Sequence, residues 1–327
     1  MSRRTKVIVD TDPGVGIPGT DADDPIAILL ALADPRLELI GVTTTFGNCP
    51  PELGARGARA VLDAAGRPDV PVAVGSAVAL NGELPGDLSS RYDGERGRAG
   101  TIPLPSLADS AISSTAAEFI VDTVNAHPHE VTLIAIGPQT NIAQALELDP
   151  GIAERLRSIV FMGGALGLDP EYGRGNVTPV AECNIWYDAD AADIVFRSGV
   201  DLTMVGLDVT NPNQGVVLSA SAISAIDPDA SAVAGMLAQI CDTYLEAPMF
   251  EWADGCVLYD PLAVAAAADP ELGEYRELAV GVERDGTLTR GQTVPLRDAV
   301  PNLRVLVKVD GAAFAGNCLD RILTLGR

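Results

Sequence analysis

The sequence has little positive charge. Its 327 residues include 22 Lys and Arg against 45 Asp and Glu, so the formal net charge is −23. Duplex nucleic acid and anionic membranes carry charge of the same sign, and we therefore expect neither as a partner. Hydrophobic residues make up 47% of the chain and charged residues 20%, a composition that is typical of folded proteins and excludes a disordered chain.

Cysteine and histidine are scarce and widely spaced. The chain contains five cysteines and two histidines: Cys49, Cys183, Cys241, Cys256, Cys318, His127 and His129. Because no C-x-x-C pair occurs, neither a zinc site nor a disulfide framework is indicated. No stretch approaches the roughly 18 apolar residues of a membrane span, and the first apolar run is too short for a signal peptide. These absences predict a soluble protein of the cytoplasm.

The chain alternates between two kinds of segment. Short runs rich in Val and Ile predict buried strands at Lys6–Val9, Leu37–Thr44, Val70–Val74, Val131–Ile136, Ser158–Met162 and Leu202–Leu207. Longer Ala-rich stretches between them predict helices at Asp24–Ala33, Glu52–Ala65, Ser113–Ala126, Thr140–Leu148 and Ala189–Arg197. This order is typical of an α/β fold in which helices cover both faces of a mostly parallel sheet, as in Rossmann-like proteins.

The final part of the chain has a different pattern. Three short apolar runs, Leu278–Val282, Gln292–Leu296 and Leu303–Val309, lie close together with glycine-containing turns and predict an antiparallel addition to the sheet. We see no linker and no internal repeat, so residues 1–327 are expected to form a single domain. A long polar loop, Gly82–Gly100, follows one strand, and the carboxyl ends of parallel strands are where ligands bind.

The segment after the first strand is unusually acidic. Five aspartates fall within fifteen residues: Asp10, Asp12, Asp21, Asp23 and Asp24. The glycines at positions 14, 16 and 19 satisfy the G-x-G-x-x-G pattern of dinucleotide-binding loops. That pattern directs backbone N–H groups at a pyrophosphate, which five carboxylates would repel. Dinucleotide binding is therefore disfavoured.

An aspartyl phosphatase is a second interpretation of the same segment. Asp10 would be the nucleophile and Asp12 the general acid of an Asp-x-Asp pair. This reaction needs a fixed cation beside the phosphoryl group, and the two lysines, Lys6 and Lys308, lie in the first strand and near the chain end. An arginine in that role would keep this alternative open.

A site for a hard cation is the third interpretation, and the favoured one. Asp24 precedes Pro25 and would serve as a helix N-cap, but a cap explains one aspartate of the five. Carboxylates this dense repel one another unless a cation neutralises them, and Ca²⁺ accepts several oxygen ligands in a flexible arrangement. Asp12, Asp23 and Asp24 are therefore predicted to converge on a metal ion.

The acidic segment also resembles the opening motif of the nucleoside N-ribohydrolases, the inosine-uridine preferring nucleoside hydrolase family. Four further motifs follow in the family's order: Thr43-Thr-Thr-Phe-Gly-Asn48, Leu133-Ile-Ala-Ile-Gly-Pro-Gln-Thr-Asn-Ile-Ala143, Phe161-Met-Gly-Gly164 with Asn176-Val-Thr-Pro-Val-Ala-Glu-Cys-Asn184, and Asp254-Gly-Cys-Val-Leu-Tyr-Asp-Pro-Leu-Ala-Val264. Each motif is weak by itself, but five in order are a strong signal. The resemblance implies a nucleoside hydrolase fold, a ribonucleoside substrate and a homo-oligomer, either a dimer or a tetramer.

The resemblance implies a role for each matching residue. Its Ca²⁺ ligands would be Asp12, Asp24, the carbonyl oxygen of Ile136, and Asp260, and Asp12 would also be the general base on a metal-bound water. Its ribose ligands would be Asp23, Asn48, Asn184 and Asp260 at the 2′- and 3′-hydroxyls and Asn176 and Glu182 at the 5′-hydroxyl, with Met162 packed near the sugar. Asp10 would support the site from behind. The implied reaction is Ca²⁺-dependent hydrolysis of the N-glycosidic bond through an oxocarbenium-like transition state, which a carboxylate-rich pocket stabilises.

Two departures from the family's pattern concern the sugar and the leaving base. Extra residues separate Gly14 from Asp23, so Asp21 competes with Asp23 for the ribose role. Many members supply a proton to the base from histidines, and here Tyr259 stands at one such position and Asp93 at or near the other.

Leaving-group activation therefore has several candidates. They are Tyr259, Asp93, Arg91 and Arg96, with Tyr244, Trp186, Phe250 and Trp252 as aromatic residues that could stack on a base. His127 and His129 are expected in a surface turn. A chain that lost acid catalysis with its histidines would be a Ca²⁺-dependent ribose- or nucleoside-binding protein, and this alternative stays open.

Overall fold

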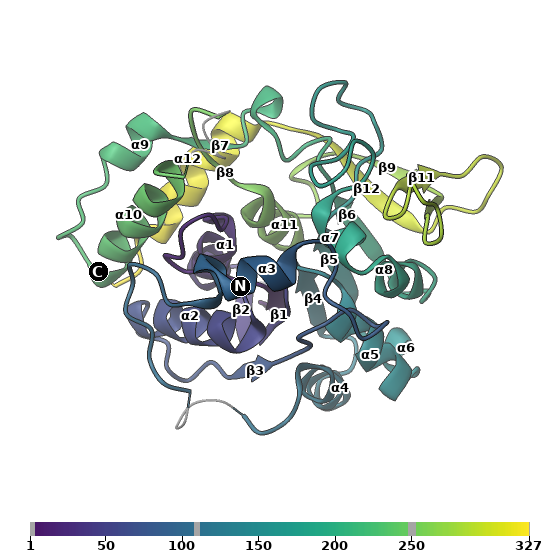
Figure 1. The fold of residues 1–327 in the computed structure, drawn as a ribbon, viewed down its shortest axis with the longest axis horizontal. Helices are drawn as coiled ribbons and strands as arrows, with labels where there is room; N and C mark the ends of the chain where they lie inside the picture. Colours follow the sequence, from purple (N-terminus) through teal and green to yellow (C-terminus); the bar gives the residue numbers. More distant parts are fainter. Residues whose placement is uncertain (1–3, 108–111, 248–252, 327) are drawn as a thin grey trace.

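A central eight-stranded sheet organises the molecule (Figure 1). The computed structural model describes residues 4–107, 112–247 and 253–326. In spatial order the strands are β3 (Val72–Val74), β2 (Leu37–Thr44), β1 (Thr5–Thr11), β4 (Val131–Ala135), β5 (Ser158–Met162), β6 (Leu202–Val205), β12 (Leu303–Val309) and β9 (Gly273–Leu278). All neighbouring strands are parallel except the antiparallel pair β12 and β9. The predicted mostly parallel sheet is confirmed.

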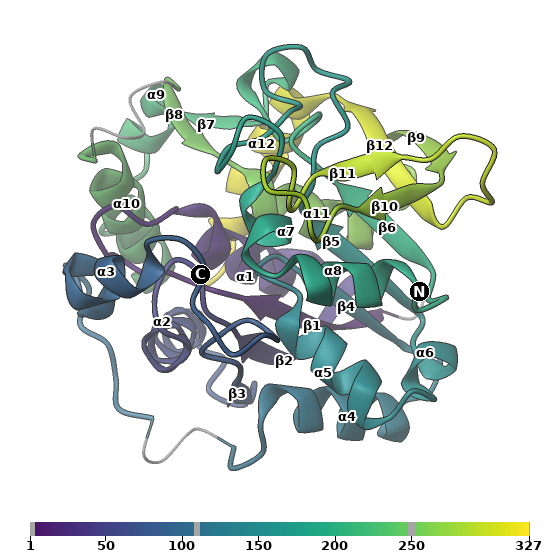
Figure 2. The same ribbon diagram turned by 45° about the vertical axis from the view of Figure 1, so that its right-hand side comes forward.

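Helices cover both faces of this sheet, as predicted. Successive residues of a strand point to opposite faces, so Val7 and Val9 of β1 pack into one core and Ile8 packs into the other. The first core includes α1 (Asp23–Ala33), α2 (Pro51–Ala64), α10 (Ala232–Leu245), α11 (Tyr259–Ala268) and α12 (Gly311–Ile322). The second includes α4 (Ala116–Ala126), α5 (Thr140–Leu148), α6 (Ile152–Arg155) and α8 (Ala189–Phe196), of which α4, α5 and α8 lie together on one side in Figure 2.

Helix starts differ from the predictions at three places, and the smallest differences are those of α1 and of α2, which begins at Pro51 in place of Glu52. The helix expected from Ser113 begins at Ala116, because Thr115 and Glu118 form a reciprocal capping box at its N-terminus. Asp24 was considered as an N-cap, but α1 begins at Asp23, so Asp24 lies inside the first turn. The Asp24 carboxylate is therefore free to bond outside its own helix.

The C-terminal strands required a correction. The single strand expected at Leu278–Val282 is two strands, because the chain leaves β9 at Leu278 and continues as β10 (Val280–Val282). β10 pairs with β11 (Thr293–Pro295) in a separate antiparallel sheet, while β12 joins the main sheet beside β6. β9 is an edge strand with several exposed, polar side chains. Its sequence therefore contains no continuous apolar run from which a strand could be predicted.

The remaining elements are short. Two strands, β7 (Val217–Ser219) and β8 (Gly255–Val257), form a second antiparallel pair. The short helical elements are α3 (Leu88–Asp93), η1 (Glu95–Gly97), α7 (Cys183–Tyr187), η2 (Pro212–Gln214) and α9 (Ala220–Ser224). α3 and η1 fall inside the segment Gly82–Gly100, which was expected to be a loop, because one turn of helix leaves no apolar periodicity to detect. Within the described ranges, no helix has the length and apolar character needed to cross a bilayer.

One buried carboxylate ties the N-terminal part of the fold to its last helix. Asp34, which ends α1, is 2% exposed and accepts hydrogen bonds from Arg36 and from Arg321 at the end of α12. Although burial opposes ionisation, these two guanidinium groups hold the pKa of Asp34 below its ordinary value.

We expect Asp34→Asn to lower the free energy of unfolding by about 2 kcal/mol, because Arg321 loses a buried charged partner and Arg36 is left with the exposed Asp269. A depressed carboxyl pKa stabilises the fold above the unfolded-state pKa of roughly 4, so the difference from wild type should shrink as the pH falls below that value. Asp69→Asn is the control, because the Asp69–Arg67 pair is exposed and should contribute under about 1 kcal/mol. Urea unfolding at neutral and acidic pH measures both, and equal effects would contradict the account.

Candidate active site

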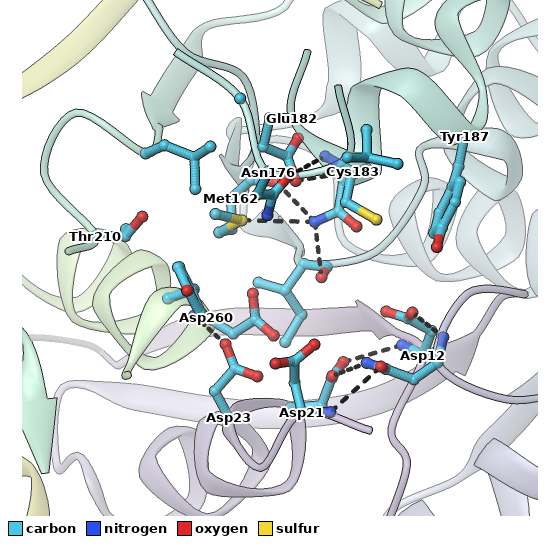
Figure 3. A pocket seen from close by; sticks show the side chains of 18 of the residues that line it. Asp12, Asp21, Asp23, Met162, Asn176, Glu182, Cys183, Tyr187, Thr210 and Asp260 are labelled. Carbon is cyan, nitrogen blue, oxygen red and sulfur yellow. Dashed lines mark hydrogen bonds between the residues drawn. The ribbon is translucent and has the colours of Figure 1, made fainter. Parts of the chain in front are cut away.

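A cavity of about 470 Å³ opens at the carboxyl edge of the sheet. Asp12, Ile136 and Met162 line it, and they lie at or directly after the ends of β1, β4 and β5. Parallel strands bring these ends together at one edge, so three distant segments meet in one place. All the predicted catalytic, substrate and metal residues line this single cavity (Figure 3).

Three buried carboxylates converge at the floor of the cavity. Asp23 and Asp24 belong to the first turn of α1 and Asp260 to the first turn of α11. One carboxylate oxygen from each lies within 4.8 Å of the other two. The backbone N–H of Asp260 donates to Asp23 Oδ2 at 3.1 Å, which fixes the two helix starts relative to each other. The structure thus groups Asp23 with the predicted metal ligands Asp24 and Asp260.

The carboxylates of this floor repel one another. Burial and the neighbouring aspartates raise the pKa of Asp23 and Asp260 well above the ordinary value. Burial raises the pKa of Asp24 to about 6, against hydrogen bonds from Thr11 and Asp12 that favour its charged form. Convergent, buried, all-oxygen donors with unbalanced negative charge fit a hard divalent cation.

Asp12 is held rigidly beside this cluster. Its Oδ2 accepts the backbone N–H of Asn48 at 2.6 Å. A Cβ at Gly47 would lie 1.9 Å from that same oxygen, and a Cβ at Gly137 would lie 2.8 Å from Asp12 Oδ1. Because glycine has no Cβ, the Asp12 carboxylate can occupy the space beside both positions. Burial and the charge of Asp24 raise the pKa of Asp12 well above its ordinary value.

Asn48 connects the carboxylates to one another. Its side-chain amide donates to Asp24 Oδ2 at 3.0 Å, and its Oδ1 accepts the backbone N–H of Asp21 at 3.3 Å. Asp24 Oδ1 accepts from the Thr11 hydroxyl at 2.5 Å and from the Asp12 backbone at 3.1 Å. Three places in the acidic loop, at Asp12, Asp21 and Asp24, are thereby fixed around Asn48.

Asp10 lies behind the cavity. It is fully buried, and its Oδ1 accepts from the Thr43 hydroxyl at 2.5 Å and from the Asn141 amide at 2.7 Å. Burial raises its pKa to about 6, although both hydrogen bonds oppose the shift. A nucleophile must reach its substrate, so this geometry counts against the phosphatase interpretation and agrees with a supporting role.

A second set of polar groups forms the opposite wall. The Glu182 carboxylate caps α7 by accepting the N–H groups of Asn184 at 2.8 Å and Ile185 at 3.1 Å, and it also accepts that of Gly164 at 2.9 Å. The Asn184 amide donates to the carbonyl oxygens of Ile136 and Met162 at 3.2 and 3.3 Å. Asn176 Oδ1 accepts the N–H of Cys183 at 2.9 Å.

The leaving-group candidates separate clearly in the structure. Tyr259, Arg91 and Arg96 line the cavity, whereas Asp93 is exposed and lies outside the lining. Tyr244 and Trp186 do not line it, and Phe250 and Trp252 lie outside the described residues. His127 and His129 follow α4 in the connection to β4, as expected of a surface turn.

Several lining residues were not predicted. Cys183 lies inside the motif that ends at Asn184, and Tyr187 follows Asn184 by three residues on α7, so helical spacing from that motif would have found Tyr187. Glu171 and Tyr172 carry no such signal. They belong to a loop whose backbone N–H groups at Leu166, Leu168 and Asp169 are held by the buried carboxylate of Asp208, a contact between distant segments.

Comparisons with known proteins show the family of this chain. The family model described as inosine-uridine preferring nucleoside hydrolase matches residues 7–316. The pyrimidine-specific ribonucleoside hydrolase RihA of Salmonella agona is 37% identical over 97% of both chains. Uridine nucleosidase 1 of Arabidopsis thaliana is 36% identical over 88% of this chain and 80% of its own.

Solved structures show the same fold. A purine-preferring ribonucleoside hydrolase from Gardnerella vaginalis superposes with a TM-score of 0.84 at 37% identity and covers 98% of each chain. The plant nucleoside hydrolase PpNRh1 superposes with a TM-score of 0.85 at 33% identity, covering 98% of this chain and 99% of its own. The predicted family resemblance and fold are confirmed.

We expect Asp260→Asn to weaken Ca²⁺ binding by at least about tenfold in a calorimetric titration, because one of three convergent anionic ligands is lost. Protons compete for carboxylates with raised pKa values, so the wild-type affinity should fall as the pH drops from about 8 to about 5. Asp254→Asn is the matched control, because Asp254 is exposed and outside the cavity lining. Equal affinity in wild type and Asp260→Asn would contradict the site.

Proposed function

Because this chain belongs to the inosine-uridine preferring nucleoside hydrolase family, we propose that it hydrolyses the N-glycosidic bond of ribonucleosides with Ca²⁺ bound at the aspartate cluster. The products are ribose and a free base. The observation that carries the proposal is the convergence of Asp23, Asp24 and Asp260 beside Asp12 in one cavity. The enzyme class follows from relatives that are ribonucleoside hydrolases and uridine nucleosidases.

In this proposal the cation ligands are Asp24, Asp260, Asp12 and the carbonyl oxygen of Ile136. Asp23 lies close enough to join them, in addition to the ribose role expected for it. Flexible coordination by six to eight oxygens suits Ca²⁺, whereas Mg²⁺ demands a near-octahedral site. When bound, the cation supplies a fixed positive charge that lowers the pKa of a coordinated water and orients the sugar diol.

Asp12 is the proposed general base. Its carboxylate is fixed by Asn48 and by the space at two glycines, so it keeps one orientation toward the cavity. Burial and Asp24 raise its pKa toward the range in which a carboxylate accepts a proton readily. It would take the proton from the attacking water.

The ribose is proposed to lie between the two polar walls. Asp23, Asn48, Asn184 and Asp260 would bind the 2′- and 3′-hydroxyls, and Asn176 and Glu182 would bind the 5′-hydroxyl. All of these side chains line the cavity, and Met162 lies among them as an apolar contact for the ring. The surrounding carboxylates would stabilise the positive charge that develops on the ring at the transition state.

Tyr259 is proposed as a hydrogen-bond donor to the departing base, one that keeps its own proton because burial raises its pKa. It lines the cavity at the first position of α11, next to Asp260, and the described residues offer its hydroxyl no hydrogen-bond partner. The curated relatives include pyrimidine-specific enzymes and the solved relatives a purine-preferring one, at the same 37% identity. Similarity therefore leaves the base preference open. A homo-oligomer in the cytoplasm stays a prediction.

We expect Asp12→Asn to lower kcat by about 10²–10⁴-fold while ribose still binds, because the general base is lost and the sugar contacts remain. Reducing-sugar release measures turnover, and calorimetry with ribose measures binding. Asp93→Asn serves as the control, because its exposed side chain lies outside the cavity and its turnover should match wild type. A turnover of Asp12→Asn within about threefold of wild type would remove Asp12 from the mechanism.

A panel of purine, pyrimidine and nicotinamide ribosides tests the function itself. Chelator-treated protein should release no ribose and regain activity on adding Ca²⁺, because the cation is needed at the cluster. Tight nucleoside binding without turnover of any member would favour the binding-protein alternative. Ribose release that is indifferent to the chelator would contradict calcium dependence.

A further inference from the structure

The lining of the cavity combines many carboxylates with two arginines. Its lining includes seven carboxylates: Asp12, Asp21, Asp23, Asp24, Asp260, Glu171 and Glu182. Among the lining residues only Arg91 and Arg96 carry positive charge, and neither histidine of the chain is present. The proposed sugar and metal contacts use most of the carboxylates and neither arginine. The two arginines are therefore the charged lining residues that remain for the base.

Arg96 reaches the cavity from η1, which lies far in sequence from the acidic loop. Its guanidinium donates to the carbonyl oxygen of Gly19, two residues before Asp21. Its charge partly offsets the burial that raises the pKa of Asp21. No carboxylate of the described residues lies within 4.0 Å of Arg96, so one carbonyl bond leaves most of its five N–H donors available.

Arg91 also lines the cavity and belongs to α3, the short helix before η1. Its Nε pairs with Asp87 at 2.8 Å, and its side chain is 37% exposed, so it reaches the cavity from the solvent side. Burial and Cys183 raise the pKa of Tyr187, and the charges of Arg91 and Arg96 both act in the opposite direction. Both guanidinium groups line the same cavity as Tyr187 and Cys183.

We propose that Arg96, assisted by Arg91, stabilises the departing base as an anion, in place of a proton donor. This inference rests on the proposed function. An arginine cannot serve as the acid, because its pKa stays above 12 in proteins. It offers instead a fixed positive charge and a planar set of N–H donors, which bind a delocalised anion through charge-assisted hydrogen bonds.

The step balances without a proton on the base at the moment of bond breaking. The C1′–N bond breaks and its electron pair leaves with the ring nitrogen, while water oxygen bonds to C1′ and its proton passes to Asp12. The base anion beside Arg96 takes a proton from solvent after release, and Asp12 returns its proton to solvent. Because arginine only donates, the substrates are nucleosides whose departing base carries its charge on ring nitrogens or exocyclic oxygens that accept hydrogen bonds.

The test compares two kinds of leaving group in the full-length protein with Ca²⁺. Uridine and inosine need help to depart, whereas the nitrophenolate of p-nitrophenyl β-D-ribofuranoside is a stable anion that leaves unaided. We expect Arg96→Gln to lower kcat by about 10²–10³-fold on uridine and inosine and by less than about threefold on the nitrophenyl riboside. Arg96→Lys should recover part of the loss, because it restores the charge without the planar donors.

A purely structural role of Arg96 would give a different result in this test. If its bond to Gly19 merely holds the acidic loop, Arg96→Gln would slow both kinds of substrate equally and weaken Ca²⁺ binding, and the proposal would be wrong. Unchanged kcat on every substrate would also overturn it. Arg98→Gln is the control, because Arg98 is exposed and outside the lining.

The outcome for wild type separates this inference from the proposed function. Release of ribose from nucleosides supports the function whatever Arg96→Gln does. Failure of wild type to release ribose from either kind of substrate would overturn the function, and the arginine proposal with it.

Discussion

The repulsion among buried carboxylates at one edge of the sheet is the constraint on which the rest of this structure depends. Asp12, Asp23, Asp24 and Asp260 come from the end of β1, the start of α1 and the start of α11, and all are nearly inaccessible to water. Such a cluster is unfavourable unless charge is added, because burial and proximity each oppose ionisation. Backbone and side-chain groups of Asn48, Thr11 and Asp260 donate hydrogen bonds to these carboxylates and fix their orientation. Hydrogen-bond donors orient the carboxylates but do not neutralise their negative charge. The cluster therefore favours binding of a cation.

The cavity at this edge of the sheet contains both carboxylates and arginines. In the proposed arrangement the carboxylates bind the cation and the ribose, which would gain positive charge, and the two arginines of the lining face the base, which would gain negative charge. An N-glycosidic bond breaks with this separation of charge, so a pocket polarised in the same direction favours the transition state over the neutral substrate. The two parts come from different pieces of the fold: the strand ends and α11 supply the acidic part, and α3 with η1 supplies the basic part. In this proposal, variation of the short α3–η1 segment would alter base recognition.

Much of this was predictable from the sequence for identifiable reasons. β5, α5 and β12 have the predicted bounds, because each is a continuous apolar or amphipathic run buried on the faces that the pattern indicates. The convergence of Asp23 and Asp24 beside Asp12 was predictable because they share one acidic segment after a strand, whereas Asp260 was named only through the family resemblance. Arg91 and Arg96 could be named but not placed, because α3 and η1 are too short to leave a periodic signal. Glu171 and Tyr172 escaped altogether, because a long-range contact with Asp208 decides where their loop lies.

A crystal structure grown with Ca²⁺ and measured for anomalous scattering tests the central claim most directly. The account predicts one strong anomalous peak at the floor of the cavity, within coordination distance of about 2.3–2.6 Å of oxygens from Asp24 and Asp260 and adjacent to Asp12 and Asp23. A map without a peak there, or with Ca²⁺ bound only at surface carboxylates, would contradict it.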